Sequence, residues 1–203
     1  MATTNPTSAV IKHRVPKVLS HQQVGAIFAE MTNLESIEVA RRYVIHHTLH
    51  KAGLRAAELL NLRPEDIALN EEHPYLRVTC GKGSKQRNVP ISTALEGHLR
   101  DWMAMRPESE WFFCRVRAGA SGGKMDPREL RYMTTRAGEA AGVDSVNPHR
   151  WRHTCATELI EGGCATIHVA RFLGHVNVAT TECYLWVRQE ELWGRVQAAQ
   201  AVN

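Results

Sequence analysis

Apolar residues recur along most of this chain every three or four positions, which is the period of a helix that buries one face. One such face is formed by Leu95, Leu99, Trp102 and Met103. The pattern predicts a mostly helical chain. Helices are expected over about 20–31, 37–51, 54–62, from 93 onward, 126–141, from 147 to about 161, 165–173, 180–187 and 189–201.

The expected helix ends carry residues that satisfy unpaired backbone groups. Ser20 followed by Gln23 predicts a capping box, and Thr93 with Glu96 repeats the pattern. At two further starts, a residue that can cap the helix precedes a proline at the first helical position: Asp126-Pro127 and Asn147-Pro148. Glycines are expected to end helices at Gly53, Gly162-Gly163 and Gly174.

The hydrophobic period changes in the middle of the chain. Residues 75–80 and 87–91 are typical of strands, and the glycine-rich turn between them predicts a β-hairpin. Residues 111–116 favour a short buried strand. We therefore expect an α+β fold, predominantly helical, with a small antiparallel sheet. One domain over 17–203, including a C-terminal helix, would follow a flexible tail at 1–16.

Composition narrows the class of protein. No apolar stretch approaches the roughly 20 residues that span a bilayer, and no secretory signal is evident, so we expect no membrane partner. Five cysteines without a CxxC favour reduced thiols and a cytoplasmic protein. With 25 basic and 21 acidic residues, the net charge of +4 permits a nucleic-acid partner without requiring one.

The last third of the chain contains a candidate phosphate site. His149 and Arg152 lie one turn apart at a helix start, where backbone N–H groups also favour an anion. A core histidine beside a surface arginine would give the same pattern. His149 and His153, at i and i+4, would suit zinc, but no acidic residue lies between them and an arginine disfavours a cation. We expect no metal and no cofactor.

Tyr184 is the candidate nucleophile downstream of this pair. A phenol has a pKa near 10, so only about one in a thousand is ionised at neutral pH. Tyr184 would need a base and nearby positive charge, which His149, His175 and arginines could supply. Most tyrosines in amphipathic helices are core or interface residues, so Tyr184 by itself does not decide the function.

Two upstream segments carry further candidates. Glu58 shares a helix face with Arg55 and would either form a surface ion pair or orient Arg55 toward a phosphate. Lys82 lies in the expected hairpin turn, where its charge would serve solubility or donate a proton in a groove.

Four segments, in this order, closely resemble the tyrosine recombinases, also called the phage integrase family. They are GLRAAELLNL, GKGSKQRNVPI, PHRWRHTCATEL and LGHVNVATTECY. The intervals match as well, including nine residues from His175 to Tyr184. The resemblance covers about residues 17–190 and implies the catalytic domain of that family.

The resemblance implies a role for each matching residue. Tyr184 would attack a DNA phosphodiester and form a 3′-phosphotyrosine with a free 5′-hydroxyl. Arg55 and Arg152 would clamp the non-bridging oxygens, a task that suits the planar guanidinium. Lys82 would be the general acid for the leaving 5′-oxygen, with Lys85 as a weaker candidate.

The remaining residues are assigned on the same resemblance. His149 would act as base or hydrogen-bond donor near the tyrosine, and His175 would contact the scissile phosphate. Glu58 would support the first arginine, and His153 would be structural. Three basic residues are expected to contact DNA: Lys85, Arg87 and Arg150.

The family also implies partners. These would be double-stranded DNA, a homotetramer on DNA whose protomers exchange C-terminal helices, and an accessory DNA-bending protein or a second recombinase. Members usually carry a core-binding domain before the catalytic one. Only about twenty residues precede the first expected helix here, so we expect a short form that lacks it, a fragment, or a chain that uses a partner.

Two other functions fit the same residues. A type IB topoisomerase shares this chemistry, although the interval from His175 to Tyr184 favours a recombinase. A non-catalytic DNA-binding regulator derived from an integrase is the other alternative. The outcome of recombination (integration, excision, inversion or resolution) is not encoded in these motifs.

Overall fold

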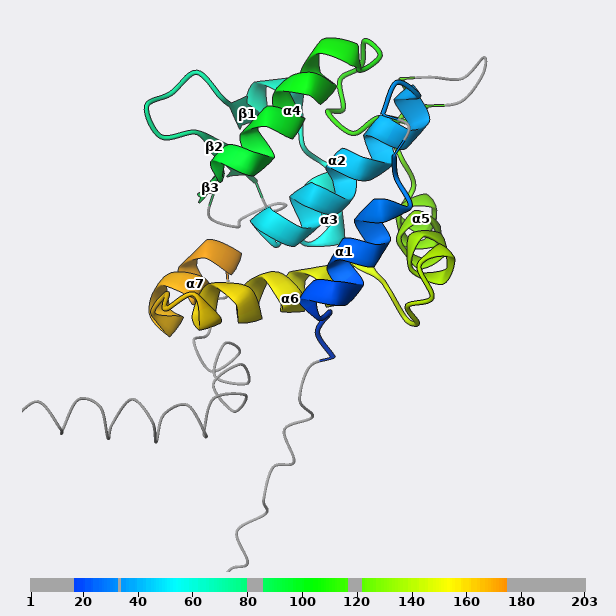
Figure 1. The fold of residues 1–203 in the computed structure, drawn as a ribbon. Helices are drawn as coiled ribbons and strands as arrows, with labels where there is room; N and C mark the ends of the chain where they lie inside the picture. The colour runs from blue at the N-terminus through cyan, green and yellow to red at the C-terminus, as the bar shows by residue number, and fades with distance from the viewer. Residues whose placement is uncertain (1–16, 33, 80–85, 117–121, 175–203) are drawn as a thin grey trace, which may run out of the picture.

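The computed structural model describes residues 17–32, 34–79, 86–116 and 122–174 (Figure 1). Its elements, in chain order, are α1 (His21–Ala29), α2 (Ile37–Ala52), α3 (Ala56–Leu60), the 3-10 helix η1 (Pro64–Asp66), β1 (Ile67–Ala68), β2 (Tyr75–Val78), β3 (Arg87–Pro90), α4 (Thr93–Met105), α5 (Pro127–Ala140), α6 (Pro148–Glu161) and α7 (Thr166–Leu173). The expected α+β fold, mostly helical with a small antiparallel sheet, is confirmed.

The helix starts follow the capping residues closely. Ser20 and Gln23 form the reciprocal capping box expected for α1. At the start of α5, the Asp126 side chain accepts a hydrogen bond from the Arg128 backbone N–H. At the start of α6, the Asn147 side chain accepts one from the Arg150 backbone N–H. At α4, however, the N-cap is Ser92, whose hydroxyl accepts from the Leu95 N–H, so the prediction of Thr93 as the capping residue was wrong by one position.

The sheet has three strands in the order β1-β2-β3, all antiparallel. The expected hairpin is confirmed, with Leu76 opposite Val89. The two-residue strand β1 was missed because it is too short to show a period of two. The strand expected over 111–116 was wrong, since among the described residues this segment forms a single isolated bridge, between Cys114 and Lys124.

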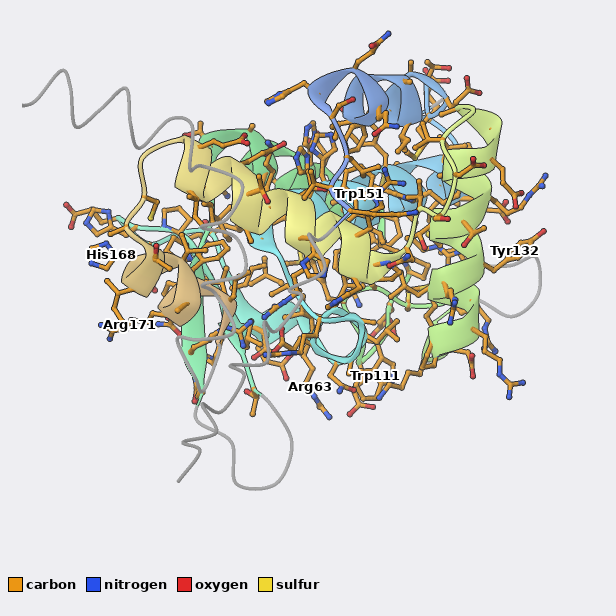
Figure 2. The ribbon with its side chains drawn as sticks, turned by 90° about the horizontal axis from the view of Figure 1, so that it is seen from below. Arg63, Trp111, Tyr132, Trp151, His168 and Arg171 are labelled. Atoms are coloured by element: carbon orange, nitrogen blue, oxygen red, sulfur yellow. The ribbon has the colours of Figure 1, made fainter. Side chains whose placement is uncertain are left out.

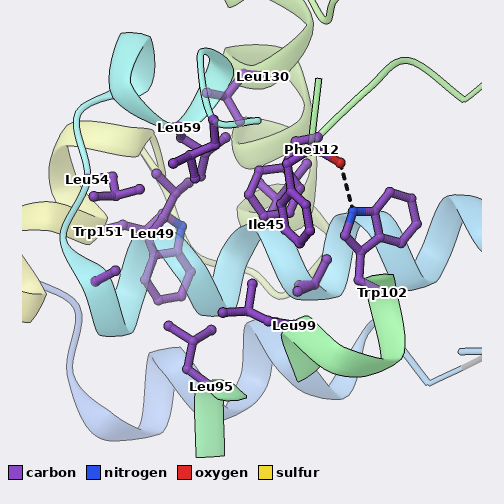
Figure 3. Close-up of a cluster of buried hydrophobic side chains, with 14 of the residues drawn as sticks. Ile45, Leu49, Leu54, Leu59, Leu95, Leu99, Trp102, Phe112, Leu130 and Trp151 are labelled. Atoms are coloured by element: carbon purple, nitrogen blue, oxygen red, sulfur yellow. Dashed lines mark hydrogen bonds between the residues drawn. The ribbon is translucent and has the colours of Figure 1, made fainter. Parts of the chain in front are cut away.

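Helix α2 is the centre of the fold. It packs against α4 on one side and α6 on the other (Figure 1). Ile45 and Leu49 are fully buried among side chains from the neighbouring helices (Figure 3). The Trp102 indole N–H donates to the Phe112 carbonyl oxygen at 3.0 Å, which fixes the segment after α4 on the core. The core thus joins helices from both halves of the chain.

Arg152 of α6 donates to the carbonyl oxygens of Gly53, at the end of α2, and of Leu173, at the end of α7, and α7 packs on β3. Segments distant in sequence therefore lie side by side here (Figure 1). Among the described residues, no helix is long and apolar enough to cross a membrane. The helices expected at 180–187 and 189–201 lie outside the described residues, as does the expected tail at 1–16.

Candidate active site

Arg55 is held at the start of α3 by a glutamate one turn further on. Gly53 ends α2 in the left-handed region at φ 58°, which turns the chain into α3. The Arg55 backbone N–H then donates to Glu58 Oε2 at 2.9 Å, and its Nη1 donates to Glu58 Oε1 at 2.7 Å. The Arg55 side chain is 44% exposed, whereas that of Glu58 is only 3% exposed. The buried carboxylate therefore fixes an arginine that solvent can reach.

Arg152 enters the same place from α6. It is buried, and its guanidinium donates to the Gly53 carbonyl oxygen at 2.6 Å and to the Leu173 carbonyl oxygen at 2.8 Å. Its Nη1 lies 4.0 Å from Glu58 Oε2. Because Gly53 contacts Arg152 and lies two residues before Arg55, the turn between α2 and α3 sets the spacing of both arginines.

A third arginine reaches Glu58 from the sheet. Arg87 of β3 donates from Nη1 to Glu58 Oε1 at 2.9 Å and from Nη2 to Oε2 at 2.8 Å. Its Nε donates to the Phe172 carbonyl oxygen at 3.0 Å. This bidentate geometry is the strongest form of an arginine–carboxylate pair. We call Arg55, Glu58, Arg87 and Arg152 the arginine cluster.

The end of α7 accepts a hydrogen bond from each arginine of the cluster. Besides the bonds to Phe172 and Leu173, Arg55 Nη2 donates to the Gly174 carbonyl oxygen at 3.1 Å. These carbonyls carry the partial negative charge of a helix C-terminus, which suits guanidinium groups. Guanidinium charges still outnumber the carboxylate, so the cluster favours a further anion at the exposed Arg55.

His149 and His153 lie on α6 beside Arg152. Their rings meet edge to face with centroids 4.1 Å apart. Desolvation, then the charges of Arg152 and Arg55, lower the pKa of His149 below its usual value. Desolvation and the neighbouring His149 lower the pKa of His153 to about 4. Both imidazoles are therefore neutral at pH 7, and His149, which is exposed, is able to accept a proton.

Arg150 points to a different part of the molecule. Its guanidinium donates to the carbonyl oxygens of Asp144 and Val18, the latter at 3.1 Å, and to Gln23 at 3.4 Å. It thus ties α6 to the start of α1 instead of joining the arginine cluster. The expected contacts of Arg150 and Arg87 with DNA stay predictions.

Four of the expected site residues lie outside the described residues: Lys82, Lys85, His175 and Tyr184. Among the described ones, Arg55 and Arg152 meet at Glu58, and His149 lies near enough to both arginines for their charges to lower its pKa. The catalytic roles of these residues stay predictions. Sequence reasoning did not recognise that Arg87 pairs with Glu58. The signal was available, because residues two apart on a strand share a face and Val89 is a core residue.

The described residues contain no group of three or more His, Cys, Asp or Glu side chains placed to hold a metal ion. His149 and His153 thus have no third ligand of these types within that part of the chain. The described cysteines, Cys114, Cys155 and Cys164, form no disulfide.

The chain is similar to several known proteins over most of its length. The chain is 33% identical over 185 residues to tyrosine recombinase XerC of Corynebacterium glutamicum, covering 91% of this chain and 59% of that protein. It is 33% identical to tyrosine recombinase XerA of Thermococcus kodakarensis, covering 95% and 66%. The chain therefore spans about 59% of the length of the XerC relative.

Solved structures show the same fold. A crystal structure of XerA recombinase matches with a TM-score of 0.73 and 27% identity, covering 94% of this chain and 66% of that one. A XerH site-specific recombinase bound to its difH substrate matches the fold with a TM-score of 0.71 at 23% identity, covering 85% and 50%. The family described as the phage integrase family matches residues 17–191. This chain therefore belongs to the phage integrase family.

Proposed function

We propose that this chain is the catalytic part of a site-specific DNA recombinase that cleaves and rejoins strands through a 3′-phosphotyrosine. The observation that supports it most is the convergence of Arg55 and Arg152 on Glu58, although α3 and α6 are far apart in sequence. Relatives named tyrosine recombinases and solved complexes of similar fold with DNA add to this support.

The proposed cleavage step balances without an external reactant. The Tyr184 oxygen forms a bond to phosphorus while the bond from phosphorus to the 5′-oxygen breaks. Neutral His149 takes the phenol proton, and Lys82 donates a proton to the leaving 5′-oxygen. Rejoining runs the same steps backward with the 5′-hydroxyl of a partner strand. Because the protein–DNA bond retains the energy of the phosphodiester, no nucleotide cofactor is needed.

The arginines would stabilise the charge that builds up on phosphorus. Arg55 and Arg152 would each bind a non-bridging oxygen, where preorganised donors contribute most to a transition state. Exposed Arg55 can meet DNA directly, whereas buried Arg152 would donate from the floor of the site. His175 would contact the same phosphate. Double-stranded DNA is the proposed substrate, with a homotetramer exchanging strands between two duplexes.

Covalent trapping tests this proposal. The probe is a pool of nicked duplexes of random sequence, incubated with the chain and then denatured. Adducts are separated on a denaturing gel, and their DNA is sequenced to define a working substrate. We expect an adduct with the wild type and none with Tyr184→Phe, while Arg152→Lys reduces it strongly because it loses planar two-point contact with phosphate.

The result also separates the alternatives. No adduct from the wild type, or an equal amount from Tyr184→Phe, would contradict the proposed chemistry and leave a DNA-binding regulator. Relaxation of a supercoiled plasmid that carries the recovered sequence, without any recombined product, would favour a topoisomerase.

A further inference from the structure

We infer that Arg87 is a positioning residue of the strand-cleavage site, which holds the Glu58 carboxylate in the orientation that aligns Arg55 and Arg152. This inference rests on the proposed function. It assigns Arg87 a task different from the DNA contact that its basic character suggested.

The first argument is the geometry at the two carboxylate oxygens. Glu58 Oε1 accepts from Arg55 Nη1 at 2.7 Å and from Arg87 Nη1 at 2.9 Å. Glu58 Oε2 accepts from the Arg55 backbone N–H at 2.9 Å and from Arg87 Nη2 at 2.8 Å. A two-point contact fixes the rotation of the carboxylate plane, which a single contact leaves adjustable. The orientation of Arg55 therefore depends on Arg87 through Glu58.

The second argument is that Arg87 is itself held firmly. Its Nε donates to the Phe172 carbonyl oxygen at 3.0 Å, and β3 packs on α7. A Cβ atom built on Gly174 would lie 2.8 Å from Arg87 Nη1 and 2.9 Å from its Cζ. The guanidinium thus fits against a backbone that leaves no room for a side chain. Movement of Arg87 would disturb the end of α7, which also accepts from Arg55 and Arg152.

The third argument excludes a direct contact with DNA in this arrangement. The Arg87 side chain is 13% exposed, against 44% for Arg55. Its Nε, Nη1 and Nη2 all donate within the protein. A phosphate would have to displace the buried carboxylate of Glu58, which would then lose its main partner at a high cost.

Charge gives Arg87 a further effect on the site. Without it, the negative Glu58 would offset much of the positive potential that Arg55 and Arg152 present to a phosphate. With it, three positive charges surround one negative charge, so the net charge of the arginine cluster is +2 instead of +1 and the site attracts an anion more strongly while the carboxylate keeps its structural task. Position and charge both act on chemistry at the bound phosphate more than on the affinity for DNA.

The test compares cleavage with binding on the duplex recovered by covalent trapping. Arg87→Met removes the charge, both hydrogen bonds to Glu58 and the one to the Phe172 carbonyl oxygen, whereas Arg87→Lys keeps the charge. We expect Arg87→Met to lower the single-turnover rate of adduct formation about 100-fold, the effect of a misplacement near 1 Å. Arg87→Lys should restore part of that rate. For Arg87→Met, the slope of the logarithm of the DNA association constant against the logarithm of salt concentration should stay unchanged. Loss of a phosphate contact would instead reduce the magnitude of that slope by about 0.9.

A double-mutant cycle with Glu58→Gln shows whether Arg87 acts through Glu58. If it does, the double variant cleaves no more slowly than the slower single variant, because the second change removes nothing further. The inference would be overturned if the two single substitutions multiply in their effects on the cleavage rate. It would also be overturned if Arg87→Met changes the salt dependence of DNA binding but leaves the cleavage rate unchanged. A wild-type chain that forms no adduct would instead contradict the proposed function.

Arg100→Met is the matched control. Arg100 also pairs with a glutamate, Glu96 at 2.8 Å, and donates to a backbone carbonyl, that of Leu69 at 2.6 Å, on a different part of the fold. Its loss should leave the rate of adduct formation close to wild type. Equal losses from Arg87→Met and Arg100→Met would reduce Arg87 to a general stabilising residue.

Discussion

Two clusters of buried polar side chains lie on different faces of α6, and their polar groups are accommodated in different ways. Trp151 and Arg152 are neighbours on α6, yet Trp151 belongs to one cluster and Arg152 to the other, because successive helical residues point about 100° apart. Figure 2 shows Trp151 in the interior of the molecule. Its group, which we call the histidine cluster, consists of Phe28, Tyr43, His46, His47, His50, His98 and Trp151.

The histidine cluster is packed through rings. His47 lies 4.0 Å from the Phe28 centroid and 4.4 Å from that of His98. Within the described residues, neither ring nitrogen of His47 has a hydrogen-bond partner. Desolvation lowers the pKa of His47 to about 3 and that of fully buried His46 to about 4. These imidazoles therefore avoid the cost of burial by staying neutral.

The arginine cluster cannot use that solution, since a guanidinium keeps its charge at any ordinary pH. Its charges are instead matched by Glu58 and by carbonyl oxygens at the end of α7. The comparison teaches that only one of these two buried polar regions is suited to attract an anion. It also predicts that the arginine cluster is destabilised by loss of its carboxylate partner, whereas the histidine cluster is destabilised by a fall of pH.

The largest expected effect comes from removing the shared partner. Glu58→Ala leaves guanidinium groups facing each other without their carboxylate, which should lower the free energy of unfolding by about 3–5 kcal/mol. Urea unfolding at pH 7.5 measures it. A loss below about 1 kcal/mol, the range of a surface pair, would show that the cluster does not depend on Glu58.

Acid should act next most strongly, and on the histidine cluster. As pH falls below 6.5, the unfolded chain takes up a proton at His46, whereas the folded chain does not until about pH 4. Stability is thus full above pH 6.5 and lost toward pH 4, by about 3 kcal/mol for His46 alone.

The urea concentration at the midpoint of unfolding, measured from pH 7.5 down to pH 4.5, reports this loss of stability. Burial alone would raise the pKa of Glu158, but hydrogen bonds and charges of His50 and Lys51 outweigh it and lower the pKa to about 2. The stability that Glu158 contributes is full above its ordinary pKa near 4.5, so it is lost at lower pH than that of the histidines. A flat midpoint down to pH 4.5 would contradict the neutral histidines.

A smaller effect is expected where backbone meets the arginine cluster. Gly174 and Gly142 both have positive φ, 68° and 66°. Among the described residues, a Cβ atom at Gly174 would lie 2.8 Å from Arg87 Nη1, whereas one at Gly142 would have no neighbour within 4 Å. Gly142→Ala should cost about 1–2 kcal/mol through its backbone alone. Gly174→Ala should cost more and also slow adduct formation. Equal losses from both variants would show that the close approach to Arg87 has no energetic weight.

The smallest effect on stability is expected for His47→Phe. Phenylalanine keeps the ring packing and removes two buried nitrogens that have no partner within the described residues, so stability at pH 7.5 should change by less than about 1 kcal/mol. The stability lost between pH 6.5 and 4.5 should shrink, since one neutral imidazole is gone. An unchanged pH dependence would mean that His47 does not contribute to it.

The helices were predictable because their signals are local. These signals act within one turn, and the structure places Ser20, Asp126 and Asn147 as N-caps, with Gln23 completing the capping box of α1. The prediction of a strand at 111–116 was wrong because it rested on apolar content alone. That segment is indeed buried, but the Trp102 indole holds it through the Phe112 carbonyl instead of a neighbouring strand.

The sequence by itself determined which residue types are available for the proposed chemistry at a phosphate: Arg55, Arg152, His149 and Tyr184 are recognisable from their motifs and order. Only the tertiary structure decided how the arginines are held, because ion pairs such as Arg87 with Glu58 join elements whose proximity depends on the packing of α2, α6 and α7. Local propensity acts over one turn, whereas a buried charge is stabilised by whichever partner the whole fold brings within hydrogen-bond distance.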